Sequence, residues 1–385
     1  MTFTSFAKPE RLQMLQQLIA TPSVSCVDSA IDQSNLPVIH LLANWLSELG
    51  FQVEEVPVAQ GKANLIATLG SGSGGLILAG HTDTVPYDEE RWQHNPFKLS
   101  EDGGKFYGLG TSDMKAFLAL AIEAAISFEK NDYQHPLIIL ATSDEETTMA
   151  GAKALVNAGK PAARYAIIGE PTGMKPIRMH KGIMMEAIRI TGLAGHSSNP
   201  AYGHNALEAM HKVIAELMLW RNELQQQFTN ALFEVPVPTL NFGHIHGGDN
   251  PNRICGACEL HIDIRPLPGM SLLDLRCELN ARLQKVMPAH GFKLETRALF
   301  PGTAAMETPA ESALVKAAEK LTGFSAGSVA FGTEAPYLTE LGIDTIVLGP
   351  GDIAQAHQPD EYLDIDRIQP TVDLLKQFIH RFCIK

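Results

Sequence analysis

Residues with imidazole or carboxylate side chains follow several apolar segments of the chain, each near the point where the segment ends. These side chains provide nitrogen and oxygen ligands that suit zinc or a similar first-row metal ion. They are His81 and Asp83 after residues 75–80, Glu145 and Glu146 after 137–142, Glu170 after 165–169, His357 after 344–349, and Asp113 ahead of the apolar stretch 114–128.

The set is larger than one catalytic ion requires. A single catalytic zinc ion is typically held by three protein ligands, whereas two imidazoles and three carboxylates are available here. Two ions that share a bridging carboxylate fit such a set. A pair of ions can polarise a carbonyl group and lower the pKa of a bound water to roughly 7, which is the chemistry of amide hydrolysis.

Each of these residues, taken singly, also has a structural interpretation. Asp113 could cap the N-terminus of a helix, and Glu145 with Glu146 could form a solvated turn. The same chemistry nevertheless recurs at the same end of successive apolar segments. This recurrence favours a metal site over a set of unrelated surface residues.

The apolar segments themselves predict buried β-strands. Residues 75–80, 137–142, 165–169 and 344–349 are almost wholly apolar. Strands of this kind are typical of a largely parallel sheet with both faces covered by helices. Ligands of open α/β sheets bind outside the carboxyl ends of the strands, so we expect the residues that follow these strands to converge on one crevice.

A second type of strand lies between the buried ones. In Cys258–Ile264, every second residue from Leu260 onward is apolar, as in a sheet with one face in water. Further elements predicted in this part are strands at 184–191 and 239–245 and helices near 205–219 and 272–283. We therefore predict an α/β catalytic domain with a largely parallel sheet, formed by residues 1–181 and 297–385, and an inserted α+β domain formed by residues 182–296.

Composition excludes several classes of protein. The 385 residues are enough for about two domains. The net charge of −13 argues against a nucleic-acid-binding surface. Residues 1–10 lack the features of a secretory signal, and no apolar run is long enough to span a bilayer. With five cysteines, an odd number, no disulfide framework is indicated. We expect a cytoplasmic enzyme that binds neither nucleic acid nor membrane.

Motifs over almost the whole chain resemble the aminoacylase-type family of dinuclear zinc metallopeptidases and deacylases. The clearest are GHTDTVP, YGLGTSDMK, ATSDEET, IIGEPT and GHSSNP within residues 80–200, and DIRPLPGM, FGTEAP and LGPGDIAQAHQPDEY within residues 263–362. The resemblance implies a zinc-peptidase-like catalytic domain and an inserted domain that serves as lid and dimerisation domain. It implies two divalent ions, Zn²⁺ or Co²⁺, as cofactors.

The resemblance also implies a role for each residue at the metal site. Asp113 would bridge the two ions. His81 and Glu170 would complete one site, and Glu146 and His357 the other. The remaining two roles are those of Glu145, which would be the general base, and Asp83, which would orient the imidazole of His81.

Further residues are implied in substrate binding and assembly. His196 of the inserted domain would reach the active site of a partner subunit and help bind the carbonyl oxygen, so a homodimer with shared sites is expected. Asn252, Arg265 and the adjacent Arg253 are candidates for binding the substrate carboxylate. Alternatively, His196 is an ordinary loop histidine.

Two positions bear on the choice of substrate. Lys181 stands where desuccinylases of the family carry an arginine, which argues against a succinyl substrate. Glu334 is a candidate partner for a side-chain ammonium of the substrate, and its alternative interpretation is a solvent-facing or helix-start glutamate. The pattern is most similar to members that release L-ornithine and acetate from N2-acetyl-L-ornithine. The second choices are hydrolysis of N-succinyl-diaminopimelate and a broader deacylase or dipeptidase activity.

Overall fold

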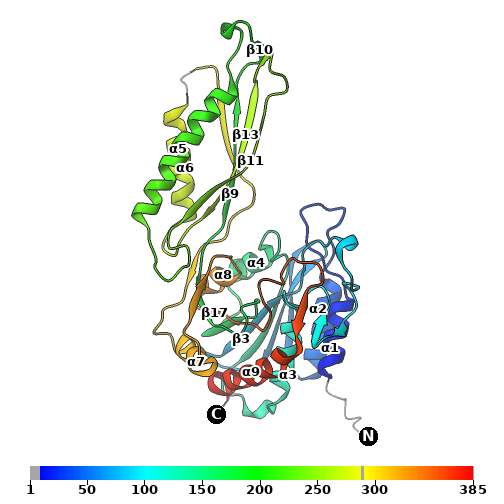
Figure 1. Ribbon diagram of the computed structural model, residues 1–385. Coiled ribbons are helices and arrows are strands. Elements are labelled where there is room, and N and C mark those ends of the chain that lie inside the picture. Colours follow the sequence, from blue (N-terminus) through cyan, green and yellow to red (C-terminus); the bar gives the residue numbers. More distant parts are fainter. Residues whose placement is uncertain (1–8, 288–289, 385) are drawn as a thin grey trace. The chain divides into compact units, whose positions relative to one another are not determined.

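The computed structural model describes residues 9–287 and 290–384, and it divides the chain into two compact units (Figure 1). The first unit contains the described residues up to Arg178, together with Thr308–Gly327 and those from Thr333 onward. The second contains Met179–Glu307 and Ser328–Gly332. The second unit therefore interrupts the first in sequence, and Lys181 belongs to the second unit.

A mixed sheet forms the centre of the first unit. Its strands follow the order β1-β2-β6-β3-β7-β17-β8. Strand β3 pairs in parallel with both β6 and β7, and β7 pairs in parallel with β17. The parallel strands are almost entirely buried, because helices cover both faces of the sheet. The strands of this unit are β1 (Gln52–Ala59), β2 (Lys62–Leu69), β3 (Leu76–His81), β4 (Ser100–Asp102), β5 (Lys105–Tyr107), β6 (Leu137–Thr142), β7 (Tyr165–Ile168), β17 (Asp344–Val347) and β18 (Tyr362–Asp364), and β8 (Ile177–His180) and β16 (Gly327–Val329) begin in it.

The helix α3 (Lys115–Ile126) is buried on nearly all sides of its surface. It packs against β3, α1 and α9 on one face of the sheet, whereas α4 and α8 lie on the opposite face (Figure 1). This explains why α3 is apolar on nearly all sides although it is not a membrane span. The other helices of the unit are α1 (Arg11–Ala20), α2 (Leu36–Glu48), α4 (Ala150–Ala158), α7 (Ala313–Thr322), α8 (Ala335–Glu340) and α9 (Ile368–Cys383).

The second unit is an antiparallel sheet with two long helices. The strand order is β11-β13-β9-β14, and α5 and α6 pack together beside the sheet (Figure 1). In β13 every second residue is buried, and the buried residues share one core with α5 and α6. The elements are β9 (Met184–Thr191), β10 (Gly195–His196), α5 (Ala206–Gln227), β11 (Thr239–Gly247), β12 (Arg253–Ile254), β13 (Ala257–Arg265), α6 (Leu272–Val286), β14 (Lys293–Ala298) and β15 (Met306–Glu307).

The predicted α/β class and the buried parallel strands are confirmed. So are the alternating strand over Cys258–Ile264 and the helix over 272–283, which Ser271 caps by accepting a hydrogen bond from the Asp274 backbone N–H. The sequence analysis missed the antiparallel pair β1 and β2, which extends the sheet at one edge. The central sheet is thus parallel in its middle and antiparallel at its flanks.

Candidate metal centre

The carboxyl ends of three adjacent strands deliver most of the candidate ligands. His81 is the last residue of β3, Glu145 and Glu146 follow β6, and Glu170 follows β7. Because β3 lies between β6 and β7, these side chains start from neighbouring positions at one edge of the sheet. The close packing of β7 on α3 depends on Gly169, where a Cβ atom would lie 2.0 Å from the Phe117 ring.

Asp113 lies between the two candidate histidine ligands. Its Oδ1 is 3.1 Å from Nε2 of His81, and its Oδ2 is 3.7 Å from Nε2 of His357. Asp113 stands two residues before α3, and Met114 occupies the N-cap position. The carboxylate therefore turns one oxygen toward each imidazole, which is the arrangement that a carboxylate bridging two ions requires.

The remaining carboxylates complete a group on either side of Asp113. Nε2 of His357 lies 3.0 Å from Oε2 of Glu146, and Nε2 of His81 lies 3.9 Å from Oε1 of Glu170. In each of three triads the potential ligand atoms lie within 4.8 Å of one another. The triads are His81 with Asp113 and Glu170, Asp113 with Glu146 and His357, and His81 with Glu145 and Glu146.

The imidazole of His81 is oriented by the backbone. Its Nδ1 lies 2.9 Å from the carbonyl oxygen of Asp83 and 3.8 Å from the Asp83 carboxylate. Because a carbonyl oxygen can only accept, Nδ1 donates, which leaves Nε2, the nitrogen that faces Asp113, as the one that would bind a metal ion. The nearer contact of His81 with Asp83 is thus to the main-chain oxygen, and an orienting role for the Asp83 carboxylate stays a prediction. The Asp83 carboxylate accepts the backbone N–H of Glu146 instead, at 3.1 Å.

Buried carboxylate oxygens without a partner show that the site fits cations. Among the described residues of the first unit, one oxygen of each of four buried or part-buried carboxylates makes no hydrogen bond: Asp83, Glu146, Glu170 and Glu334. A buried carboxylate without compensation is costly, and divalent ions supply the compensating charge. The donor set of two imidazoles and several carboxylates therefore fits two divalent ions.

The electrostatics of the site agree with a cluster of buried acids. Burial, followed by the charge of Glu170, raises the pKa of Glu145 well above its ordinary value. Burial, followed by the charge of Asp113, raises the pKa of Glu170 in the same direction. The hydrogen bond with Glu146 raises the pKa of His357 to about 9, although burial opposes it. Like charges in such proximity favour cation binding.

A buried ion pair supports the segment that carries Glu145 and Glu146. Asp144 precedes them with a left-handed backbone at φ 56°, and His357 has φ 60°. Lys62 donates to Oδ1 of Asp144 at 2.8 Å, and Oγ of Ser25 donates to the same oxygen at 2.9 Å. Left-handed conformations of residues other than glycine are unfavourable, so surrounding contacts must hold them.

Comparison with known proteins places this site in a family. Residues 77–381 match the model of peptidase family M20/M25/M40. The acetylornithine deacetylase of Edwardsiella ictaluri (strain 93-146) is 52% identical over 377 residues, covering 97% of this chain and 98% of that protein. The acetylornithine deacetylase of Proteus mirabilis (strain HI4320) is 51% identical over 378 residues, covering 98% and 97%.

The chain belongs to peptidase family M20/M25/M40. It is a metal-dependent hydrolase, as the sequence predicted. Solved structures share the fold: a metallo-carboxypeptidase from Sulfolobus solfataricus has a TM-score of 0.76 at 19% identity, with 96% of this chain and 98% of that chain covered. A dinuclear metal-binding peptidase from Bacillus subtilis has a TM-score of 0.66 at 15% identity, with 96% and 97% covered.

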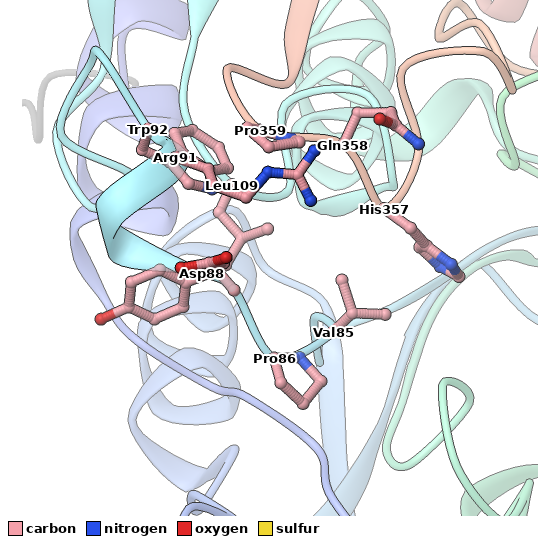
Figure 2. Close-up of a pocket in the computed structure, with 10 residues that line it drawn as sticks. Val85, Pro86, Asp88, Arg91, Trp92, Leu109, His357, Gln358 and Pro359 are labelled. Atoms are coloured by element: carbon pink, nitrogen blue, oxygen red, sulfur yellow. The ribbon is translucent and has the colours of Figure 1, made fainter.

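The metal centre of this M20 family member borders a small pocket of about 210 Å³. Figure 2 shows His357 at one end of the pocket and Trp92 at the other, with the guanidinium of Arg91 extending between them. Apolar side chains such as Val85 and Leu109 alternate around it with the charged Asp88. The pocket could take a short chain attached to a group held at the metal ligands.

The second unit places its candidate residues in two groups. His196 pairs with Arg253 across β10 and β12, and the Asn252 carbonyl accepts the Ser197 backbone N–H at 3.0 Å. Arg253 is exposed and paired with Asp249. In the other group, Nζ of buried Lys181 donates to the Val237 carbonyl at 2.6 Å. Burial lowers the pKa of Lys181, and the nearby positive charge of Arg265 lowers it further. Arg265 is itself paired with the carboxylate of Asp263 at 3.0 Å.

Glu334 lies deep in the first unit. It is 2% exposed, occupies the N-cap position of α8 and accepts a hydrogen bond from Oγ1 of Thr142 at 2.8 Å. Burial raises its pKa to about 7, and the charges of His81 and Asp83 act on it. Glu334 is therefore a helix-start residue that faces the floor of the metal centre, not solvent.

Sequence reasoning missed two buried residues beside the site. Glu361 and Lys115 both occur in the motifs that carried the resemblance, but no role was assigned to either. The ammonium of Lys115 donates to the carbonyls of Leu18 and Thr21 at 2.8 and 2.9 Å. Burial lowers the pKa of Lys115 to about 7. A charged residue at the start of the largely apolar stretch 114–128 was the available signal.

None of the helices in the described part of the chain is both long and apolar enough to cross a membrane.

Proposed function

We propose that the chain removes the acetyl group of N2-acetyl-L-ornithine, which yields L-ornithine and acetate for arginine biosynthesis in the cytoplasm. The observation that carries this proposal is the placement of Asp113 between His81 and His357. Relatives at 51–52% identity that bear the name acetylornithine deacetylase support the choice of substrate. Zn²⁺ or Co²⁺ would occupy the centre, held by the two histidines with Asp113, Glu146 and Glu170.

The residues of the centre can divide the work of amide hydrolysis among them. Two bound divalent ions would polarise the scissile carbonyl and make the attacking water more acidic. Glu145 takes the proton of this water as it attacks the acetyl carbon. The same carboxyl then returns the proton to the nitrogen of the leaving amine. Burial raises the pKa of Glu145, which makes its carboxyl able to hold a proton between the two steps.

The substrate assignment can be tested with purified protein stripped of metal by a chelator. Restoring Zn²⁺ or Co²⁺ should restore hydrolysis of N-acetylornithine, while N-succinyl-diaminopimelate and a dipeptide are cleaved slowly. Lys181 in place of an arginine argues against the succinyl substrate. Preferential turnover of either competing substrate would reverse the assignment.

Glu334 is the proposed selector for the side-chain ammonium of ornithine. Its buried oxygen without a partner could accept such a donor, provided that the ammonium enters the floor of the site. We predict that N-acetylornithine is hydrolysed with a kcat/KM about tenfold to a hundredfold higher than N-acetylnorvaline, which lacks the amine. The substitution Glu334→Gln should reduce this ratio toward one. A ratio of one in the wild-type enzyme would remove Glu334 as selector.

The second unit is proposed as a lid and dimerisation domain, with Asn252, Arg253, Arg265 and Lys181 binding the substrate carboxylate. Among the described residues, the exposed imidazole of His196 forms hydrogen bonds only within its own loop, with the hydroxyl and the backbone N–H of Ser198. We propose that it acts in the site of the partner subunit of a homodimer. Mixing inactive His196→Ala and Glu145→Ala subunits should then restore up to about a quarter of wild-type activity, because half of the dimers are hybrids with one intact site. No recovery after proven subunit exchange would contradict shared sites.

A further inference from the structure

A buried carboxylate binds the backbone of the loop that presents Asp113. Glu361 is 1% exposed. Its Oε1 accepts the backbone N–H groups of Ser112 at 2.7 Å and Asp113 at 2.9 Å, and both of its oxygens lie 3.1 Å from the N–H of Gly110. Three amides of one short loop thus converge on a single side chain.

The main chain of Glu361 holds the same loop. Its carbonyl oxygen accepts the N–H of Gly108 at 3.0 Å and lies 3.4 Å from Oγ1 of Thr111. Among the described residues, Glu361 forms no ion pair at salt-bridge distance, so its carboxylate is satisfied by backbone amides. Buried N–H groups that lose their acceptor are costly, so these amides hold the loop against the Glu361 side chain. The loop from Gly108 to Asp113 is therefore fixed mainly by this residue.

Glu361 also belongs to the segment that carries His357. Its contacts join two stretches that lie about 250 positions apart in the chain. A further hydrogen bond joins the same two stretches: the backbone N–H of Asp352 donates to Oγ of Ser112 at 3.0 Å. These hydrogen bonds therefore fix the distance between the carboxylate of Asp113 and the imidazole of His357.

We propose that Glu361 is a positioning residue that fixes Asp113 as the carboxylate shared by the two ions. This inference rests on the proposed dinuclear centre. It gives Glu361 no contact with substrate. Residues that orient metal ligands typically contribute tenfold to a hundredfold to metal affinity, because a misplaced ligand must be moved before it can bind.

The test compares three substitutions by calorimetric titration of the metal-free protein with ZnCl₂. Glu361→Gln keeps an oxygen where Oε1 accepts all three amides, so its zinc affinity should stay within a few-fold of wild type. Glu361→Asp keeps a carboxyl group but shortens the side chain by one methylene, which moves the oxygens away from the amides. Glu361→Ala leaves the amides unpaired. Both should weaken zinc binding by about tenfold to a hundredfold, and kcat should fall more than KM rises.

Glu186 offers the matched control. It is a buried carboxylate of the second unit, and it accepts a hydrogen bond from Nε of Arg276 at 2.7 Å. Glu186→Asp should lower the stability to urea without changing zinc affinity. If Glu361→Ala does not fold, the zinc affinity of Glu361→Asp tests the inference. Wild-type zinc affinity in Glu361→Asp, or an equal loss in Glu186→Asp, would overturn the inference.

Failure of the proposed function gives a different result. If the wild-type protein binds zinc but prefers another substrate, the zinc titrations still decide the role of Glu361. If the wild-type protein binds no zinc or cobalt, the proposed metal centre is overturned, and the role of Glu361 with it.

Discussion

Replacement of Glu145 by Gln is expected to lower kcat by a factor of about 10²–10⁴ while the protein still binds two divalent ions. The side chain keeps its size and its place beside His81 and Glu146, but an amide cannot take a proton from water. Metal content is measured by elemental analysis of the dialysed protein, and kcat is measured with N-acetylornithine as substrate. This pair of measurements separates a base from a ligand, because position alone gives Glu145 either role.

The neighbouring residue provides the control for this experiment. Glu146 lies 3.0 Å from His357, and we propose it as a ligand. Glu146→Gln should therefore lose metal as well as activity. Loss of metal from Glu145→Gln would assign Glu145 to the ligands, and near-normal turnover in that variant would remove it from the mechanism.

Replacement of Asp113 by Ala is expected to abolish both metal sites together. One carboxylate oxygen faces His81 and the other faces His357, so the substitution removes a proposed ligand from both sites at once. The catalytic contribution of the ions amounts to several kcal/mol, so kcat/KM should fall by on the order of 10³ or more. The measurements are zinc stoichiometry and the rate at saturating zinc.

Asp102→Ala, at an exposed position in β4, provides the control for loss of a carboxylate away from the site. It should leave zinc stoichiometry and rate unchanged. If Asp113→Ala retained one tightly bound ion and most of its activity, the carboxylate would belong to a single site.

The sequence was informative about the site because of how parallel sheets are built. His81 and Glu170 follow apolar strands, and the carboxyl ends of neighbouring parallel strands must lie at the same edge. The order of the strands was not readable, because it depends on packing across the whole sheet. Strand β1 was missed because its alternation is weak and Pro57 interrupts it.

The role of Glu361 was not readable for a different physical reason. Its partners are backbone amides of Gly110, Ser112 and Asp113, and every residue except proline offers such an amide. No residue pattern marks them. The burial of Glu334 could not be predicted either, since its partner, the hydroxyl of Thr142 at the end of β6, lies 192 positions away in sequence.

The account depends most on two cations lying together at the edge of the central sheet. Anomalous diffraction from crystals grown with Zn²⁺ and recorded at the zinc absorption edge locates them directly. We predict two peaks separated by about 3.5–4 Å, with Asp113 between them and one histidine, His81 or His357, at each. Peaks elsewhere on the molecule, or none within coordination range of these residues, would contradict the account.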